Sequence, residues 1–165
     1  MKAWKKIGIL ETDKGTTVTL RYIETDDGES AETTRRTKLR PHPKFIDCMQ
    51  KLREHAAEAL GWAEQYAKDV HVRSLSWEYD KDDKLSGYQM DVDTFNRKPI
   101  RATIGFSRAN EALQADVNDL IGEAEQYEAL LNETASERYA DQTDLPFRSN
   151  GDVTDQASVG VGATA

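Results

Sequence analysis

Hydrophobic and polar residues alternate in three consecutive segments between Val70 and Phe106. Alternation with period two places the apolar members of each segment on one face of a β-sheet and leaves the polar members toward water. Val72 is out of phase with Leu75, so we expect a β-bulge, or burial on both faces, near Arg73–Ser74. The apolar members are Leu75, Trp77 and Tyr79, then Tyr88, Met90 and Val92, then Ile100, Ala102, Ile104 and Phe106.

The N-terminal part of the chain predicts three further strands joined by tight turns. Trp4 to Leu10 forms a strand pattern, and the stretch from Thr16 to Thr25, rich in β-branched residues, predicts a second strand. Asp13-Lys14-Gly15 and Asp26-Asp27-Gly28 are expected as hairpin turns, because glycine accepts positive φ without steric cost. The polar stretch from Glu29 to Leu39 then indicates an exposed edge strand.

An amphipathic helix is expected after each group of strands. The first begins near Pro43, which suits a first helical turn, and extends to about Lys68. The second is capped by Ser107 or Asn110 and loses its periodicity after Thr134. The apolar stripes are Phe45, Met49, Leu52, Ala56, Ala59 and Ala63, continued by Trp62 and Tyr66, and Leu113, Val117, Leu120, Ala124, Tyr127 and Leu131. On the second helix the solvated face is expected to hold Asp116, Asp119, Glu123, Glu125 and Glu128.

Together these elements predict a single α+β domain. We expect an antiparallel sheet of five or six strands with two amphipathic helices packed on one face, because the apolar face of the sheet must be covered. The strands before and after the first helix form either one sheet or two. The domain is expected to span residues 1–138, followed by a flexible tail over residues 139–165. The order strand–strand–strand–helix occurs twice, but no sequence repeat is convincing.

Composition and charge narrow the classes of function. The chain has 165 residues, of which 32% are charged and 38% hydrophobic, and its net charge is −8. Residues 1–44 hold 10 Lys/Arg against 7 Asp/Glu, whereas residues 108–165 hold 3 against 12. A phosphate backbone repels such an acidic C-terminal half, so direct DNA binding is disfavoured. We expect a cytoplasmic protein without a membrane partner, because the sequence has a single cysteine and lacks both an apolar run of about 18 residues and a signal-peptide pattern.

The sequence contains no recognisable catalytic motif. Gly-rich phosphate loops are missing, and the three histidines and Cys48 lack zinc-type spacing. Asp91 and Asp93 share a strand face as a candidate carboxylate pair, but neutralisation by Arg101 is the simpler interpretation. We therefore expect a protein that is not an enzyme and that needs no metal and no cofactor.

Four basic residues gather around the predicted edge strand: Arg35, Arg36, Lys38 and Arg40. They are a candidate site for phosphate groups or for an acidic partner. A charged edge strand also protects a sheet against edge-to-edge aggregation, and this simpler explanation stays open.

The clearest candidate for a binding motif is the segment Gln-Thr-Asp-Leu-Pro-Phe, from Gln142 to Phe147. Leu145 and Phe147 provide two apolar anchors, and Pro146 stiffens the backbone between them, which lowers the entropic cost of docking. Gln142 is suited to hydrogen bonding at the edge of a groove. The alternative is that Leu145 and Phe147 fold back onto the domain.

This segment resembles the bacterial sliding-clamp binding motif, Gln-x-x-Leu-x-Phe, and the acidic Asp-x-Leu/Ile-Pro-Phe tip of bacterial single-stranded-DNA-binding proteins. It departs from that tip, which ends its chain, because 18 residues follow Phe147. The chain also resembles small phage accessory proteins over about residues 4–147. The features that carry this resemblance are the β-hairpin at the start, the helix entry at Arg40–Phe45, the hairpin at Val72–Val92 and the segment described above. The resemblance implies a role near replication or recombination, with no activity and no catalytic residues.

These observations favour a non-enzymatic binding protein that acts on host machinery, docking on a sliding clamp or another replication, DNA-repair or defence protein. A second hypothesis is a counter-defence protein that sequesters a nucleotide signal or blocks an immune effector. In that hypothesis the basic residues hold phosphates and Trp77 or Tyr88 offers a stacking surface. A third is a virion or assembly component. Because Ser158–Ala165 lacks a bulky apolar anchor, we expect it to be ordered only in a homo-oligomer or complex.

Overall fold

The strands form one antiparallel sheet of six strands, in the spatial order β3-β2-β1-β4-β5-β6. The computed structural model describes residues 2–94, 98–106 and 109–141. The predicted α+β class and antiparallel sheet are confirmed, and the open choice is decided in favour of one sheet. The strands are β1 (Lys2–Thr12), β2 (Gly15–Asp26), β3 (Glu29–Thr37), β4 (His71–Tyr79), β5 (Leu85–Asp93) and β6 (Pro99–Gly105).

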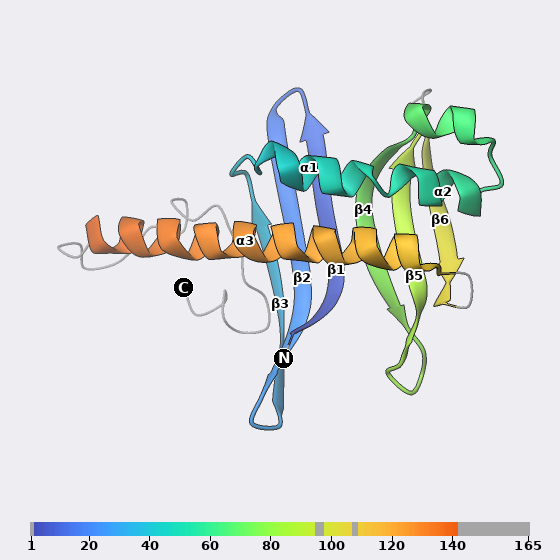
Figure 1. Ribbon diagram of the computed structural model, residues 1–165. Coiled ribbons are helices and arrows are strands. Elements are labelled where there is room, and N and C mark those ends of the chain that lie inside the picture. The colour runs from blue at the N-terminus through green and yellow to red at the C-terminus, as the bar shows by residue number, and fades with distance from the viewer. Residues whose placement is uncertain (1, 95–97, 107–108, 142–165) are drawn as a thin grey trace.

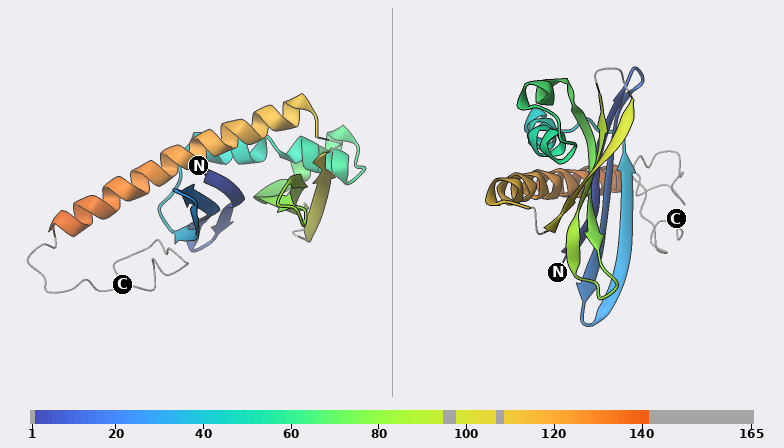
Figure 2. Two further views of the ribbon diagram at one scale, coloured as in Figure 1. Left: turned by 90° about the horizontal axis from the view of Figure 1, so that it is seen from below. Right: turned by 90° about the vertical axis from the view of Figure 1, so that its right-hand side faces the viewer.

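The helices lie on one face of this sheet, as predicted (Figures 1 and 2). After β3 come α1 (Pro43–Gln50), α2 (Arg53–Ala59) and the 3₁₀ helix η1 (Glu64–Asp69), and after β6 comes α3 (Glu111–Asp141). Among the described residues, no helix combines the length and the apolar character needed to cross a membrane.

The first predicted helix is broken before its expected end near Lys68. Gly61 follows α2 with a positive φ of 72°, and the N–H of Trp62 donates to the carbonyl oxygen of Ala57 at 2.9 Å. This is a Schellman-type helix end, in which glycine accepts the left-handed conformation. The continuation of the apolar stripe through Tyr66 was therefore wrong: Tyr66 is 53% exposed.

The last helix is longer than its hydrophobic pattern predicted. Asn110 caps α3, because its Oδ1 accepts a hydrogen bond of 2.7 Å from the N–H of Leu113. The predicted apolar stripe is buried down to Leu131. The helix nevertheless continues past Thr134 to Asp141, into the predicted tail. Strong helix formers at the positions that follow account for this continuation: Ala135, Glu137 and Arg138.

The two halves of the chain have the same topology and matching registers. At the centre β1 pairs antiparallel with β4 through Ile7 and Leu75, and an approximate two-fold axis through this pair exchanges the halves. In the first half Leu20 pairs with Ile7 and with Arg35; in the second, Met90 pairs with Leu75 and with Ala102. The repeated order strand–strand–strand–helix is therefore a structural repeat.

A β-bulge occupies equivalent positions in the two central strands. The register of β4 shifts between Val72 and Ser74, which confirms the predicted bulge. The register of β1 shifts between Trp4 and Lys6, which the sequence pattern did not predict. Each bulge adds a twist to its strand.

The core lies between the helices and the face of the sheet that they cover. Cys48 is buried in it, as predicted, at 4% exposure. A row of aromatic rings crosses the boundary between the halves: the ring centroids lie 5.2 Å apart for Trp4 and Tyr22, 6.5 Å for Trp4 and Trp77, and 6.1 Å for Trp77 and Tyr88. Such pairs add about 0.5–1.5 kcal/mol each to burial, so this row stabilises the junction of the two halves.

Candidate functional site

The predicted docking segment from Gln142 to Phe147 lies outside the described residues, but the helix that leads to it is described. Leu131 is the last side chain of α3 that is buried among those described, and α3 continues to Asp141. At 1.5 Å per residue this continuation adds about 15 Å. Figure 1 shows α3 running past the edge strand β3. The segment therefore starts at the end of a helix that leads away from the sheet.

A buried group of charges holds α3 against the first half of the sheet. Glu128 of α3 forms an ion pair with Lys2 of β1 and lies 3.8 Å from the Arg35 guanidinium of β3. Arg35 also donates a hydrogen bond of 2.7 Å to Oδ1 of Asn132. The Nζ of Lys2 lies 4.3 Å from the centroid of the Tyr22 ring. We call Lys2, Tyr22, Arg35, Glu128 and Asn132 the α3 clamp.

The α3 clamp combines two cations, Lys2 and Arg35, with one carboxylate, Glu128. Burial and the neighbouring Glu128 carboxylate raise the pKa of the Tyr22 hydroxyl far above its usual range, so Tyr22 stays neutral. Glu128 is only 5% exposed, and Glu123, 3.5 Å from Lys44, is 8% exposed. The expectation that both lie on a solvated face was therefore wrong, because basic residues of neighbouring elements pair with both carboxylates.

Arg35 differs in its environment from the other three basic residues predicted to hold phosphate. Arg35 is 8% exposed beneath α3, within the α3 clamp. Arg36 is exposed and points to the opposite face, as alternation along β3 requires. Lys38 and Arg40 are exposed beyond the end of β3. Of the four residues predicted to hold phosphate, Arg36, Lys38 and Arg40 are therefore the exposed ones, and Arg35 serves the α3 clamp.

The proposed stacking surface of the nucleotide hypothesis is also not accessible. Trp77 is 9% exposed and Tyr88 is fully buried. The Tyr88 hydroxyl donates to Oε1 of Gln114 on α3 at 3.0 Å, so it belongs to the contact between sheet and helix.

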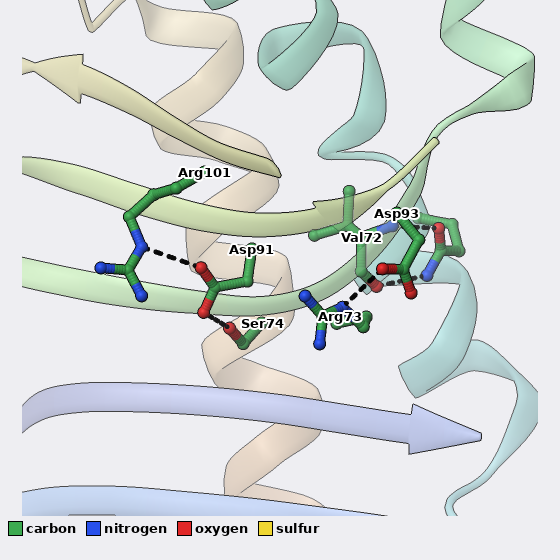
Figure 3. A network of polar contacts seen from close by, with 7 residues as sticks. Val72, Arg73, Ser74, Asp91, Asp93 and Arg101 are labelled. Atoms are coloured by element: carbon green, nitrogen blue, oxygen red, sulfur yellow. Dashed lines mark hydrogen bonds and ion pairs between the residues drawn. The ribbon is translucent and has the colours of Figure 1, made fainter. Parts of the chain in front are cut away.

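The predicted carboxylate pair lies in a polar network on the uncovered face of the sheet (Figure 3). Asp91 accepts hydrogen bonds from Nε of Arg101 at 2.9 Å and from the Ser74 hydroxyl at 3.1 Å, and Asp93 forms an ion pair of 3.1 Å with Arg73. Burial acts to raise the pKa of Asp91, but the hydrogen bonds from Arg101 and Ser74 outweigh it and lower that pKa. The predicted neutralisation by Arg101 is confirmed, and the two carboxylates are held by different cations.

One contact at the bulge of β4 was not predicted. The side-chain amide of Gln50 donates to the carbonyl oxygen of Val72 at 2.8 Å and accepts from its N–H at 3.0 Å. It thereby satisfies two backbone groups and fixes α1 to the centre of the sheet. No local pattern indicates this pairing, because the partners belong to different elements.

A histidine–aspartate pair joins α2 to α3. Nε2 of His55 lies 2.7 Å from Oδ2 of Asp116, beside a pocket of about 170 Å³ that Glu58, Thr103 and Asn110 help to line. Among the described residues, those that line this pocket include no serine or cysteine. Within the described part of the chain, no group of three or more His, Cys, Asp or Glu residues could hold a metal ion. The pair is an interhelical contact, and sequence reasoning missed it because its members lie far apart in the chain.

A second pocket is more apolar and lies at the β6 side of the molecule. Trp62, Tyr66, Val70 and Ile100 line it, together with polar side chains that include Lys98, and its volume is about 390 Å³. We call it the aromatic pocket. It exists because α2 stops at Gly61 and the chain turns into η1, which leaves Trp62 and Tyr66 at the surface.

No family model, curated protein or solved structure matches this chain. The resemblance to phage accessory proteins therefore stays a prediction, and any function must be argued from the described residues and the sequence. Two features are candidates for contact with other molecules: the segment that α3 leads to and the aromatic pocket.

Proposed function

We propose that this chain is a non-enzymatic binding module of the phage accessory type. It acts in the host cytoplasm and docks on a replication or DNA-repair protein, with a sliding clamp as the leading partner. Leu145 and Phe147 are its apolar anchors, Pro146 stiffens the segment, and Gln142 hydrogen-bonds at the edge of the partner's groove.

The observation that carries this proposal is the continuation of α3 beyond Leu131 to Asp141. A short linear motif binds in a groove only if the domain that bears it does not collide with the partner. Asp141, the residue before the segment, lies about 15 Å along the helix beyond Leu131, the last buried side chain of α3 among those described, and this length of helix provides that clearance. The α3 clamp supports it, because buried ion pairs fix the helix against β1 and β3.

Binding of the purified full chain to an immobilised bacterial sliding clamp tests the proposal. The double variant Leu145→Ala/Phe147→Ala should lose capture by at least about tenfold, because two anchors of a small interface are removed. The control is Val159→Ala/Val161→Ala, which shortens two apolar side chains of the same tail outside the docking segment. Far-UV circular dichroism should be unchanged in both. A single-stranded-DNA-binding protein and a repair nuclease serve as further immobilised partners. The proposal is contradicted if the wild type and the double variant capture every partner equally well.

The counter-defence and virion alternatives gain no support of this kind. The nucleotide hypothesis needs the basic cluster and an exposed aromatic surface, whereas Arg35, Trp77 and Tyr88 are buried.

A further inference from the structure

The aromatic pocket is suited to an extended peptide that contains proline. Its walls combine the rings of Trp62 and Tyr66 with the aliphatic side chains of Val70 and Ile100. Tyr66 is 53% exposed, so the free protein keeps a large aromatic surface in water. Aromatic-lined grooves bind proline segments because proline already has an extended backbone and loses little entropy. A volume of about 390 Å³ accommodates a few side chains.

The chain itself contains a segment with this chemistry. In Asp144-Leu145-Pro146-Phe147 a proline stands between two apolar anchors, and the carboxylates of Asp141 and Asp144 precede these anchors in the sequence. Lys98 at the pocket attracts these carboxylates, and Asp69 at the pocket opposes them. The two charges of the pocket therefore give variants with opposite expected effects.

The segment cannot enter the aromatic pocket of its own chain. The residues that line the pocket belong to η1, to β6 and to the segments beside them. Figure 1 shows that β6 lies on the side of the sheet where α3 begins, and the segment follows the other end of α3. A helix from Glu111 to Asp141 is about 46 Å long, whereas the four residues from Gln142 to Leu145 span at most about 14 Å. A second copy has no such limit. Two copies placed antiparallel along α3 bring each segment to the pocket of the other and close a two-fold dimer.

We propose that the segment from Asp144 to Phe147 docks in the aromatic pocket of a second copy and forms a reciprocal dimer. The inference rests on the proposed function, because the same two anchors serve both contacts. Self-association hides Leu145 and Phe147 from the host partner, and the partner must compete with the dimer. Dilution or a tightly binding partner then releases the segment.

Sedimentation velocity of the full chain, at concentrations from about 5 to 200 µM, tests the dimer. The wild type should become dimeric over this range, whereas Tyr66→Ala and Leu145→Ala/Phe147→Ala should stay monomeric. Lys98→Glu should weaken the dimer and Asp69→Asn should strengthen it. The matched control is Leu10→Ala, which removes another exposed apolar side chain on β1, far from the pocket, and should leave the dimer unchanged.

A labelled peptide of residues 139–150 isolates the pocket from the rest of the dimer. The full-length Leu145→Ala/Phe147→Ala chain, whose own segment is disabled, should bind the peptide with saturation in fluorescence anisotropy. Adding Tyr66→Ala to this receptor should weaken peptide binding by at least about tenfold. A monomeric wild type at every concentration, a dimer that survives loss of the anchors, or a peptide that ignores Tyr66 each overturns the inference.

The Tyr66→Ala chain separates this inference from the proposed function, because its docking segment is intact. Both hold if that variant is monomeric and captures the host partner at least as well as the wild type. If the wild type is monomeric but captures the partner, only the dimer is refuted. If the wild type forms the dimer and neither chain captures a partner, only the proposed function is refuted.

Discussion

Replacing Glu128 by alanine is the most informative single perturbation of this fold, because it removes the central anion of the α3 clamp. Glu128 is 5% exposed and stands between two cations, Lys2 and Arg35. The Lys2 side chain is 24% exposed and can turn into water, whereas that of Arg35 is 9% exposed and cannot. The variant thus removes the Glu128 carboxylate from beside the buried Arg35 guanidinium, whose hydrogen bond to Asn132 remains.

The expected loss of unfolding free energy is about 3 kcal/mol. Removing one member of a fully buried ion pair costs about 3–5 kcal/mol, and the partial exposure of Lys2 places this case at the lower end. For a chain of this length such a loss corresponds to a fall in Tm of about 6–12 °C. Lys2→Ala should cost less, about 1 kcal/mol, because Arg35 still neutralises Glu128.

Equilibrium unfolding in urea at neutral pH measures these differences. The matched control is Glu32→Ala, which breaks the exposed ion pair with Arg21 between β2 and β3 and should cost below about 1 kcal/mol. The double replacement Arg35→Met/Glu128→Leu removes both charges and should be close to neutral, since apolar residues of similar volume replace buried ion pairs without a penalty. A Glu128→Ala loss no larger than that of Glu32→Ala would refute the electrostatic reasoning.

Three further predictions concern other parts of the fold. The pKa of Asp91 lies below its ordinary value, so its bond to Arg101 stabilises the fold above about pH 4, and this stabilisation is lost as the pH falls through the folded-state pKa. When the free energy of unfolding is followed into acid, the wild type should lose up to about 1 kcal/mol more than Asp91→Asn. Burial raises the pKa of the Cys48 thiol, so its alkylation by iodoacetamide should be at least about 100-fold slower in the folded chain than in urea. A Cβ on Gly87 would lie 2.4 Å from the carbonyl oxygen of Ile104, so Gly87→Ala should lower the free energy of unfolding in urea by about 2 kcal/mol or more. By contrast, Gly122→Ala places its Cβ in open space on α3 and should raise that free energy by up to about 1 kcal/mol.

The parts of the fold that follow from local periodicity could be predicted from the sequence. Period-two alternation identified the strands, and the phase change after Val72 located the bulge of β4. The stripe from Leu113 to Leu131 gave the buried face of α3. Each of these signals depends on near neighbours in the chain, which is why a single sequence contains it.

The parts that failed depend on partners far away in the chain. Glu128 looks like a member of a solvated face, and only the approach of β1 and β3 makes it the centre of a buried cluster. Arg35 looks like its neighbour Arg36, but strand alternation sends the two to opposite faces of the sheet. The same lack of information hid the contact between His55 and Asp116. The end of the first helix at Gly61 is a local glycine signal, and the apolar residues Trp62 and Tyr66 beyond it obscured that signal.

The two-fold relation between the halves explains where the candidate contact features arise. Equivalent helices leave the sheet after β3 and after β6, and the structure departs from symmetry where these helices end. The first-half helix stops at Gly61, so the rings that follow it remain partly exposed around the aromatic pocket. The second-half helix continues to Asp141 and leads into the segment with Leu145 and Phe147. Because the axis runs the two helices in opposite directions, their ends lie at opposite sides of the sheet (Figure 1). The separation between the end of α3 and the pocket of the same chain is thus a direct consequence of the repeat, and it is the reason why the proposed docking requires a second copy.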